Sequence, residues 1–428
     1  MAQNMNEMHT PLSHDDQEAF IRRQQLVDLL KQSECLSASA VEAAFRAVPR
    51  HLFLPGIPLD KVYADEAIPT KYQDGLPISS SSQPAVMATM LEQLEVQAGH
   101  HILEIGAGTG YNAALLATLA GEGGQVITID IDDDLVTAAQ EHLKMAGFHQ
   151  VHVVCGDGAF GYREAAPYDR IILTVGSWDI ALAWIEQLKP GGRLLLPLVV
   201  QGNVQQLMAF ERTDTHLLSV SVRSGGFMPL RGVGAGPHTH MSLGPTPGLN
   251  LALGDEPRAV DPDAVYALLV GPYEDRVTSL RVSREDSWSG ISLWLALHAP
   301  TICHLAAMGT FAEQNLVPDL FGDSSKFHAT VGLFEETTLC VLMRSSDRTS
   351  SREPSPETLS WPLLIRSFGP NEQLAEQLLQ HLMAWETAGR PSSTGCRIRV
   401  YPQEVSYVPQ ATEMVVAKRW TRLVLDWP

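Results

Sequence analysis

The sequence has 428 residues, of which 45% are hydrophobic and 18% are charged, and its formal net charge is −19. This length exceeds that of one ordinary domain, so we expect two, and the composition is typical of a folded globular protein. The negative charge disfavours nucleic acid or an anionic membrane as the main partner, because both would be repelled at long range. It either attracts basic peptides or only improves solubility.

The N-terminal segment and the cysteines indicate a compartment. Residues 1–16 are polar and lack the apolar core of a signal peptide, and no stretch approaches the roughly 20 apolar residues that span a bilayer. The five cysteines are scattered and form no Cys-x-x-Cys pair. An odd, unpatterned set favours reduced, buried thiols over a disulfide or zinc framework. We therefore expect a cytoplasmic protein.

Helical and loop patterns alternate in the first hundred residues. Apolar residues recur at helical spacing over 15–48, and Pro49 ends the pattern. Residues 55–84 are rich in Pro, Gly and Ser and predict an ordered loop. A helix is expected to follow over 84–94.

Short apolar strands then alternate with helices. The strands are expected at residues 101–105, 125–129, 151–155, 170–174 and 193–197. Such alternation gives right-handed crossovers and a mainly parallel sheet covered on both faces. The predicted fold class of this half is therefore α/β and Rossmann-like.

The composition changes beyond Arg231. Residues 232–262 are dense in Gly and Pro and predict a linker. Residues 263–428 mix short strand-like runs with one good helix at 371–385, which predicts a C-terminal α+β domain. The expected domains are thus residues 1–231 and 263–428.

The strongest local signal is the segment Glu104-Ile105-Gly106-Ala107-Gly108-Thr109-Gly110. A strand leads into a turn whose glycines let the backbone approach a ligand, and a helix follows. A dinucleotide fingerprint would need its third glycine at Tyr111, but here it is Gly110. This tighter form suits S-adenosyl-L-methionine, which has no pyrophosphate, and it predicts a class I methyltransferase. A purely structural turn is the alternative.

Two later features agree with this cofactor. Asp130 ends the second strand, where a carboxylate can hold the two ribose hydroxyls. Ile131, the next residue, is also predicted to contact the cofactor. Gly156-Asp157-Gly158 follows the third strand, where a carboxylate and free backbone amides can meet the adenine. The triplet alone is a common turn, so its order and spacing after the other two carry the assignment.

We expect no metal site. His238-Thr239-His240 contains two candidate ligands, but no Cys or carboxylate stands at supporting spacing. An exposed loop is the simpler interpretation of this pair.

The part of the chain before residue 231 resembles the protein-L-isoaspartate O-methyltransferases. Pro49-Arg50-His51-Leu52-Phe53-Leu54-Pro55 is similar to the family's N-terminal motif, and Ser82-Gln83-Pro84 to the end of its active-site loop. Further segments follow in the family's order: Tyr63-Ala64-Asp65, the three cofactor segments, Pro167–Ile172, Lys189–Leu194 and Phe227–Leu230. Each segment is weak alone, but their collinear order is specific.

Two features depart from the family pattern. The family's loop is similar to Gly-His-Gly-Gln-Thr-Ile-Ser, whereas residues 76–82 read Leu-Pro-Ile-Ser-Ser-Ser-Ser, with several extra residues after Asp65. The repair enzymes of the family also usually lack a further domain of this size. Subgroups that tailor ribosomally made peptides look like this chain in both respects.

The resemblance implies that a substrate carboxylate attacks the methyl group of S-adenosyl-L-methionine. Because a carboxylate is ionised at neutral pH, alignment matters more than a strong base. Ser82 matches the family's active-site serine and would orient the carboxylate, with Ser81 and Ser80 as the next candidates. A flexible turn or a helix cap is the alternative for this serine run.

The expected substrate is an aspartate or isoaspartate of a peptide, possibly macrocyclic, whose methyl ester collapses to a succinimide (aspartimide). We expect tailoring of a ribosomally made peptide, with the residues after about 260 gripping it. The alternative is general isoaspartate repair, with the C-terminal domain as a binding or dimerisation module. Oligomeric state and ring type are left open.

Overall fold

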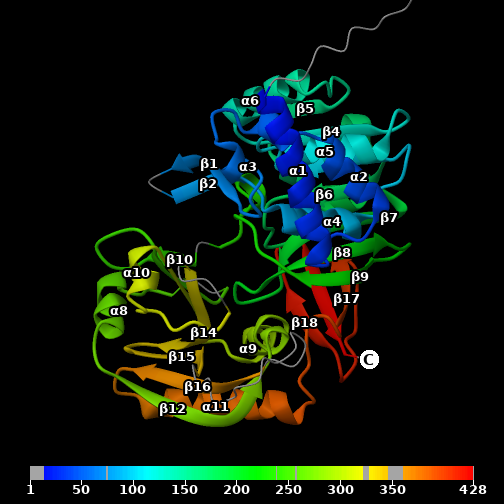
Figure 1. Cartoon of the computed structure of the whole chain (residues 1–428). Coiled ribbons are helices and arrows are strands. Elements are labelled where there is room, and N and C mark those ends of the chain that lie inside the picture. Colours follow the sequence, from blue (N-terminus) through cyan, green and yellow to red (C-terminus); the bar gives the residue numbers. More distant parts are fainter. Residues whose placement is uncertain are drawn as a thin grey trace, which may run out of the picture. The chain divides into compact units, whose positions relative to one another are not determined.

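The computed structural model describes residues 14–73, 76–237, 239–255, 258–321, 327–345 and 360–427. They form two compact units, one up to Thr174 with Gln187–Leu195, and the other of Val175–Glu186 with the chain from Leu196 (Figure 1). The division thus falls inside strand β7 (Leu188–Val199), and not at the boundaries expected at 231 and 262.

The first helical stretch is two helices, α1 (His14–Gln32) and α2 (Ser39–Ala47), and not one. Glu34 adopts a positive φ of 58° just after α1. The Glu92 carboxylate then accepts hydrogen bonds from the backbone N–H groups of Ser37 and Ala38. The helical spacing of apolar residues continues across this break, which is why the sequence pattern did not reveal it.

The segment expected to be a loop contains regular structure. It holds η1 (Arg50–Phe53), α3 (Leu59–Val62) and an antiparallel hairpin of β1 (Ile68–Gln73) and β2 (Leu76–Ser81). Pro and Ser are poor strand formers, so the local pattern hid the hairpin. Helix α4 (Pro84–Leu94) begins where predicted, with Pro84 in its first turn.

The predicted parallel sheet is confirmed in the first unit. Its strands run in the order β7-β6-β3-β4-β5. Their bounds are β3 (His101–Ile105), β4 (Gln125–Asp130), β5 (His152–Cys155) and β6 (Tyr168–Leu173), and the intervening helices are α5 (Tyr111–Ala120), α6 (Asp133–Met145), η2 (Gly158–Phe160) and η3 (Arg163–Ala165). The chain moves outward from β3 to β5 and returns on the other side of β3, which creates a topological switch point where ligands bind in such sheets.

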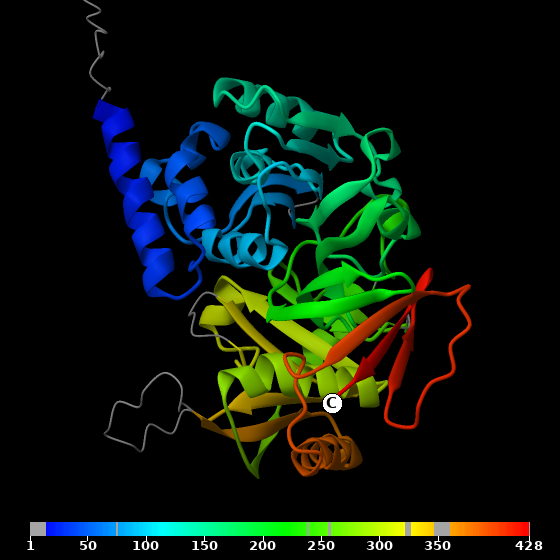
Figure 2. The ribbon, with the colours of Figure 1, turned by 90° about the vertical axis from the view of Figure 1, so that its right-hand side faces the viewer.

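The second unit contains antiparallel strands from two distant parts of the chain. They follow α7 (Leu182–Gln187) and run in the order β18-β19-β17-β9-β8. Their bounds are β8 (Gln205–Arg212), β9 (Leu217–Ser224), β17 (Arg397–Pro402), β18 (Met414–Ala417) and β19 (Thr421–Asp426). Arg399 of β17 pairs with Leu218 of β9, so the last strands, red in Figure 2, join a strand that lies about 180 residues earlier in the chain.

A separate seven-stranded antiparallel sheet fills the rest of this unit, in the order β10-β11-β13-β14-β15-β16-β12. Its strands are β10 (His240–Ser242), β11 (Leu249–Leu253), β12 (Tyr273–Val282), β13 (Ile302–Met308), β14 (Phe327–Glu335), β15 (Thr338–Arg344) and β16 (Trp361–Phe368). The helices are η4 (Gly232–Gly234), α8 (Pro262–Leu269), η5 (Asp286–Ile291), α9 (Ser292–His298), α10 (Thr310–Glu313) and α11 (Glu372–Thr387). Helix α11 packs against β14, β15 and β16.

This sheet confirms the expected C-terminal α+β composition but changes the interpretation of residues 232–262. The Gly- and Pro-rich segment predicted as a linker supplies β10 and β11. Leu249, Leu251 and Leu253 of β11 are fully or almost fully buried in the core. Their burial, and not the composition of the segment, decides its structure.

Two expectations from composition can be compared with the structure. Cys303, Cys340 and Cys396 are buried free thiols, but Cys35 is half-buried and Cys155 is exposed. His238 lies outside the described residues, and those residues hold no cluster of three metal-binding side chains. No helix in the described part of the chain is long and apolar enough to cross a bilayer.

Candidate cofactor and active site

The segments expected to bind the cofactor meet at the carboxyl ends of β3, β4 and β5. Ile105 is in register with Ile129, and Asp130 with Cys155. The N–H of Gly106 donates to the Ile129 carbonyl (2.8 Å), and the N–H of Gly156 donates to the Asp130 carbonyl (2.8 Å). The structure thus brings together the glycine segment, Asp130 and the Gly-Asp-Gly triplet.

Two glycines border open space. A Cβ at Gly108, where φ is 51°, would have only the Ser80 carbonyl (3.8 Å) and Ser79 Oγ (3.9 Å) within 4 Å. A Cβ at Gly156 would have no atom within 4 Å. These positions leave the backbone accessible to a ligand, as a cofactor cradle requires.

Two further glycines, Gly110 and Gly158, are required by packing. A Cβ at Gly110 would lie 3.1 Å from Leu143 Cγ, at a φ of 85°. A Cβ at Gly158 would lie 2.3 Å from Ile105 Cγ2, which is a severe clash. Gly110 and Gly158 therefore allow close approach of protein elements, a role that the sequence spacing does not separate from ligand contact.

Asp130 occupies the position that suits a ribose. Its side chain is almost fully buried, with Oδ2 accepting from the Gly108 N–H (2.9 Å) and Oδ1 from the Asp132 N–H (3.3 Å). Each carboxylate oxygen has a second lone pair, so both can also accept from a hydroxyl. Ile131, next along the chain, keeps 37% of its surface exposed and offers an apolar face at this edge. These residues fit S-adenosyl-L-methionine.

Glu104 lies beneath the glycine segment and is fully buried. Its Oε1 accepts from Asn112 Nδ2 (2.7 Å), and its Oε2 accepts from Thr128 Oγ1 (2.6 Å). Burial raises the pKa of Glu104 to about 7, although both hydrogen bonds oppose the shift. Of the expected cofactor residues, this one supports the turn from inside and offers no surface to a ligand.

We predict that Glu104→Gln removes a pH dependence of stability. The pKa of Glu104 is about 7 in the folded chain and near 4.5 when unfolded. Above pH 4.5 the unfolded state loses its proton first, so folding stability falls as pH rises to 7, by about 3 kcal/mol in total. Glutamine mimics the neutral acid, so urea unfolding should show this fall in the wild type only. Parallel pH curves for the two proteins would contradict the prediction.

The remaining predicted residues shape the turns. Ala107 and Thr109 are buried, and the Gly110 N–H donates to the Ala107 carbonyl (2.8 Å). The Asp157 carboxylate accepts from the Ala159 N–H (2.9 Å), which caps η2. Asp157 therefore serves at least a structural purpose beside any contact with adenine.

Sequence reasoning missed Thr174, which follows β6. Its Oγ1 donates to the Gly106 carbonyl (2.7 Å) and fixes the start of the glycine segment. No local pattern distinguishes a threonine at the end of a strand. The pairing of β6 with β3 brings Thr174 and Gly106 together, although they are 68 residues apart in the sequence.

The serine run alternates in its environment, as expected for a strand. Ser79 and Ser81 are buried, whereas Ser80 and Ser82 are half-buried. Ser81 Oγ accepts from Arg50 Nη2 (3.2 Å). The Ser82 hydroxyl makes no hydrogen bond to any residue that the structure describes. Of the three predicted serines, Ser82 and Ser80 have accessible side chains, and Ser81 is held by Arg50.

Arg50 organises this region from a fully buried position. Its Nη1 donates to the carbonyls of Val62 (2.8 Å) and Ala64 (3.3 Å). Its Nη2 donates to the carbonyls of Glu66 (3.3 Å) and Ser82 (2.9 Å). One guanidinium therefore ties together the segments that precede and follow the hairpin.

Asp65 fixes the other end of the serine run. Its Oδ1 accepts from the Ala85 N–H (2.8 Å), and its Oδ2 accepts from Gln83 Nε2 (2.9 Å). A carboxylate at the N-terminus of a helix satisfies free N–H groups and is favoured by the helix dipole. Helix α4 therefore begins at Pro84, two residues after Ser82.

Lys71 ties the hairpin to the far side of the cofactor region. Its Nζ lies 2.6 Å from Asp134 Oδ1 and 2.9 Å from Asp132 Oδ2, and these bonds raise the pKa of Lys71. Since Ser79 and Ser80 lie against Gly108, the hairpin spans from the glycine turn to the residues that follow Asp130.

We predict that Lys71→Met weakens binding of S-adenosylhomocysteine roughly three- to tenfold, because the partly exposed ion pairs that hold the hairpin are lost. The wild-type affinity should fall toward that of the variant in high salt. Lys61→Met on α3, whose side chain is exposed and unpaired among the described residues, is the matched control. Titration calorimetry at two salt concentrations checks this, and equal affinities in low salt would disprove the role.

Comparison with known proteins decides the family. Residues 21–233 match the family Protein-L-isoaspartate(D-aspartate) O-methyltransferase (PCMT). The chain is 39% identical over 212 residues to Protein-L-isoaspartate O-methyltransferase 2 of Archaeoglobus fulgidus, covering 49% of this chain and 93% of that protein. It belongs to this family. A Methanopyrus kandleri protein-L-isoaspartate O-methyltransferase is also 39% identical, over 51% of this chain and 95% of its own.

Membership confirms the predicted class I methyltransferase fold and the methyl donor, because the family depends on S-adenosyl-L-methionine. Carboxyl methylation is accordingly the activity of this chain. A solved structure of a protein-L-isoaspartate O-methyltransferase aligns with 88% of this chain and 96% of its own, at 22% identity and a TM-score of 0.48. The family match ends at residue 233.

Proposed function

We propose that this enzyme methylates an aspartate or isoaspartate carboxylate within a peptide, and that the ester then collapses to a succinimide. The observation that carries the proposal is the free Ser82 hydroxyl, which follows a hairpin lying against Gly108. A hydroxyl donor beside a cofactor cradle is what a carboxylate nucleophile needs for alignment.

S-adenosyl-L-methionine would supply an electrophilic methyl group, whose bond to sulfur breaks as its bond to the substrate oxygen forms, so that S-adenosyl-L-homocysteine leaves. Asp130 would accept hydrogen bonds from the ribose, and the accessible backbone at Gly108 and Gly156 would let the cofactor approach closely. Ser82 would donate to one oxygen of the substrate carboxylate and leave the other oxygen free to attack. No side chain has to remove a proton, because the carboxylate is already ionised. The rate acceleration then comes from orienting the carboxylate toward the methyl group and from partly excluding water.

The second step occurs within the substrate. The backbone nitrogen of the following residue attacks the ester carbonyl, a C–N bond forms, and methanol leaves with the nitrogen's proton. The product is a five-membered succinimide ring. Hydrolysis of either ring carbonyl gives aspartate or isoaspartate, so the same chemistry serves both repair and deliberate modification.

Ser82→Ala is predicted to lower kcat roughly 10- to 100-fold, since one orienting hydrogen bond is lost. The affinity for S-adenosylhomocysteine should stay unchanged. Ser80→Ala is the matched control, because Ser80 is also half-buried in the same run. Methyl transfer to an isoaspartyl peptide measures the effect, and a larger loss in Ser80→Ala would transfer the catalytic role to Ser80.

For the substrate, we propose a defined, conformationally restricted peptide of ribosomal origin, which the enzyme tailors. Two features support this choice. The hairpin that carries the serines is longer than the family's loop, and a large unit extends past the end of the family match. We assign peptide recognition to the residues after 262, with dimerisation as the alternative. We also propose a cytoplasmic location, without nucleic acid or membrane as a partner.

General isoaspartate repair is the second candidate. It is favoured by the 39% identity to relatives named protein-L-isoaspartate O-methyltransferase over almost their whole length. Mass spectrometry of a linear isoaspartyl peptide and a cyclised peptide encoded beside the gene separates the two. A gain of methyl or a loss of water only on the cyclised peptide supports tailoring. Rapid methylation of the linear peptide contradicts it and supports repair.

A further inference from the structure

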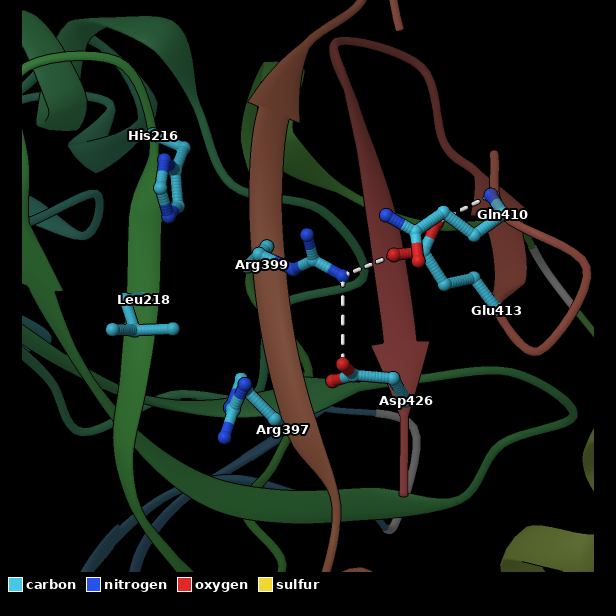
Figure 3. A pocket seen from close by; sticks show the side chains of 7 residues that line it. All are labelled: His216, Leu218, Arg397, Arg399, Gln410, Glu413 and Asp426. Carbon is cyan, nitrogen blue, oxygen red and sulfur yellow. Dashed lines mark hydrogen bonds and ion pairs between the residues drawn. The ribbon is translucent and has the colours of Figure 1, made fainter. Parts of the chain in front are cut away.

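We infer that a pocket on the sheet face formed by β9, β17 and β19 binds a carboxylate of the peptide substrate. The pocket has a volume of about 560 Å³ and is lined by strand residues and by the loop before β18 (Figure 3). This volume lies within the range of small-ligand sites. The inference rests on the proposed function, because it takes the ligand to be part of a peptide.

The register of the strands aligns the lining residues. Arg397 and Arg399 are two residues apart on β17, so their side chains leave the same face of the sheet. Leu218 of β9 pairs with Arg399 on one side. Asp426 of β19 pairs with Arg397 on the other. The two guanidinium groups therefore share one pocket with an apolar wall and an acidic wall.

The acidic wall is partly neutralised, because Arg399 lies between its two carboxylates. Arg399 Nη2 bonds to Glu413 Oε1 and lies 3.6 Å from Asp426 Oδ2. Glu413 Oε2 also accepts from Tyr407 Oη (2.7 Å) and from the Gln410 N–H (2.8 Å). These bonds, that of Gln410 first, lower the pKa of Glu413 to about 2, so its charge stays fixed. Arg399 and Glu413 thus belong to one connected network, whereas Asp426 Oδ1 is buried without a hydrogen-bond partner among the described residues.

Arg397 is the second cation of the pocket. Its side chain is exposed and makes no hydrogen bond or ion pair within the described residues. Figure 3 draws it on the side of Leu218, away from Glu413 and Gln410, with no dashed line. A free guanidinium offers paired N–H donors that match a carboxylate, and the Leu218 side chain can pack against the carbon that carries it.

The overall charge of the chain limits which anionic ligands are plausible. A chain with a net charge of −19 repels polyanions such as nucleic acid at long range. A single carboxylate is repelled least, and a peptide has two sources of one, its C-terminus and an acidic side chain. Both present the same group to Arg397, so the experiment must separate them.

The test uses three fluorescent versions of one linear isoaspartyl peptide: a free C-terminal acid, its amide, and the amide with one added glutamate. We expect wild type to bind one of the two carboxylate-bearing versions about five- to tenfold more tightly than the plain amide. The version preferred identifies the source. Arg397→Gln should abolish the preference. Arg276→Gln, which changes an arginine on β12 paired with Glu376, should retain it.

Leu218→Glu is a second variant that keeps the test decisive. It adds a carboxylate beside the two arginines and should abolish the preference without changing the thermal midpoint. Equal binding of all three peptides by wild type, or a preference retained in both pocket variants, would overturn the inference. So would competition by inorganic phosphate but not by acetate.

Methyl transfer to the same peptides is measured in parallel. Absence of transfer both to these linear peptides and to the cyclised peptide would contradict the proposed function and leave the binding result intact. Transfer to any of these peptides without a carboxylate preference in binding would reject the pocket and leave carboxyl methylation intact.

Discussion

Arg50→Met is expected to lower the free energy of unfolding by about 3 to 5 kcal/mol and to remove most of the methyl transfer activity. The guanidinium is fully buried and donates to five backbone carbonyls and the Ser81 hydroxyl. Methionine has a similar length but leaves these buried acceptors without a donor. Each unsatisfied group costs roughly 1 to 3 kcal/mol, which the loss of arginine desolvation partly offsets.

Activity should fall further than stability alone explains, because Arg50 holds the Ser82 carbonyl. Urea unfolding and kcat for an isoaspartyl peptide, measured where each variant is folded, separate the two effects. Arg50→Lys should recover part of the stability but little activity, since one ammonium cannot serve both sides of the hairpin.

Arg46→Met is the matched control for Arg50→Met. Arg46 lies on α2 and pairs with Asp28 and Glu42 near the surface, so we expect a loss below about 1 kcal/mol. Equal destabilisation by the two substitutions, or full activity in folded Arg50→Met, would contradict the organising role of Arg50.

Asp130→Asn is expected to weaken binding of S-adenosylhomocysteine roughly 10- to 100-fold. Hydrogen bonds from ribose hydroxyls to a charged carboxylate are stronger than those to an amide. Asparagine keeps one oxygen for the Gly108 N–H, so the glycine turn should persist. Its amide nitrogen cannot accept from a hydroxyl, and the loss therefore reports the ribose contact.

Asp133→Asn is the control for this contact, because it removes a neighbouring charge at the start of α6 without touching the predicted ribose position. Its affinity should stay within about threefold of wild type. Titration calorimetry with both variants decides between a specific contact and a general effect of charge. Equal weakening by both would make the loss an effect of charge alone.

The sequence by itself predicted the parallel sheet and the three cofactor segments. Both predictions depend on patterns that extend over only a few residues. These patterns are the apolar runs of the strands and the spacing of Gly106, Gly108 and Gly110. In a parallel sheet, such segments must meet at one edge, because every strand ends there. The position of Asp130 followed from this rule without knowledge of any contact.

The sequence did not reveal the hairpin or the break before α2, because their residues have weak or misleading local preferences. The strand pairing of Ile68 with Ser81 outweighs the poor propensity of the serine run. Likewise, the Glu92 carboxylate fixes the turn at Ser37 from more than 50 residues away.

Only the tertiary structure decided which of the predicted residues face a ligand. Spacing treats Gly108 and Gly158 alike, yet one borders open space and the other packs on Ile105. Sequence spacing also grouped Ser81 with Ser82, although the Ser81 hydroxyl accepts a hydrogen bond from Arg50. These distinctions depend on atoms contributed by distant segments, as does the pairing of β17 with β9. Local sequence determines the elements and the order of their chemistry, whereas packing determines which side chains remain free to react.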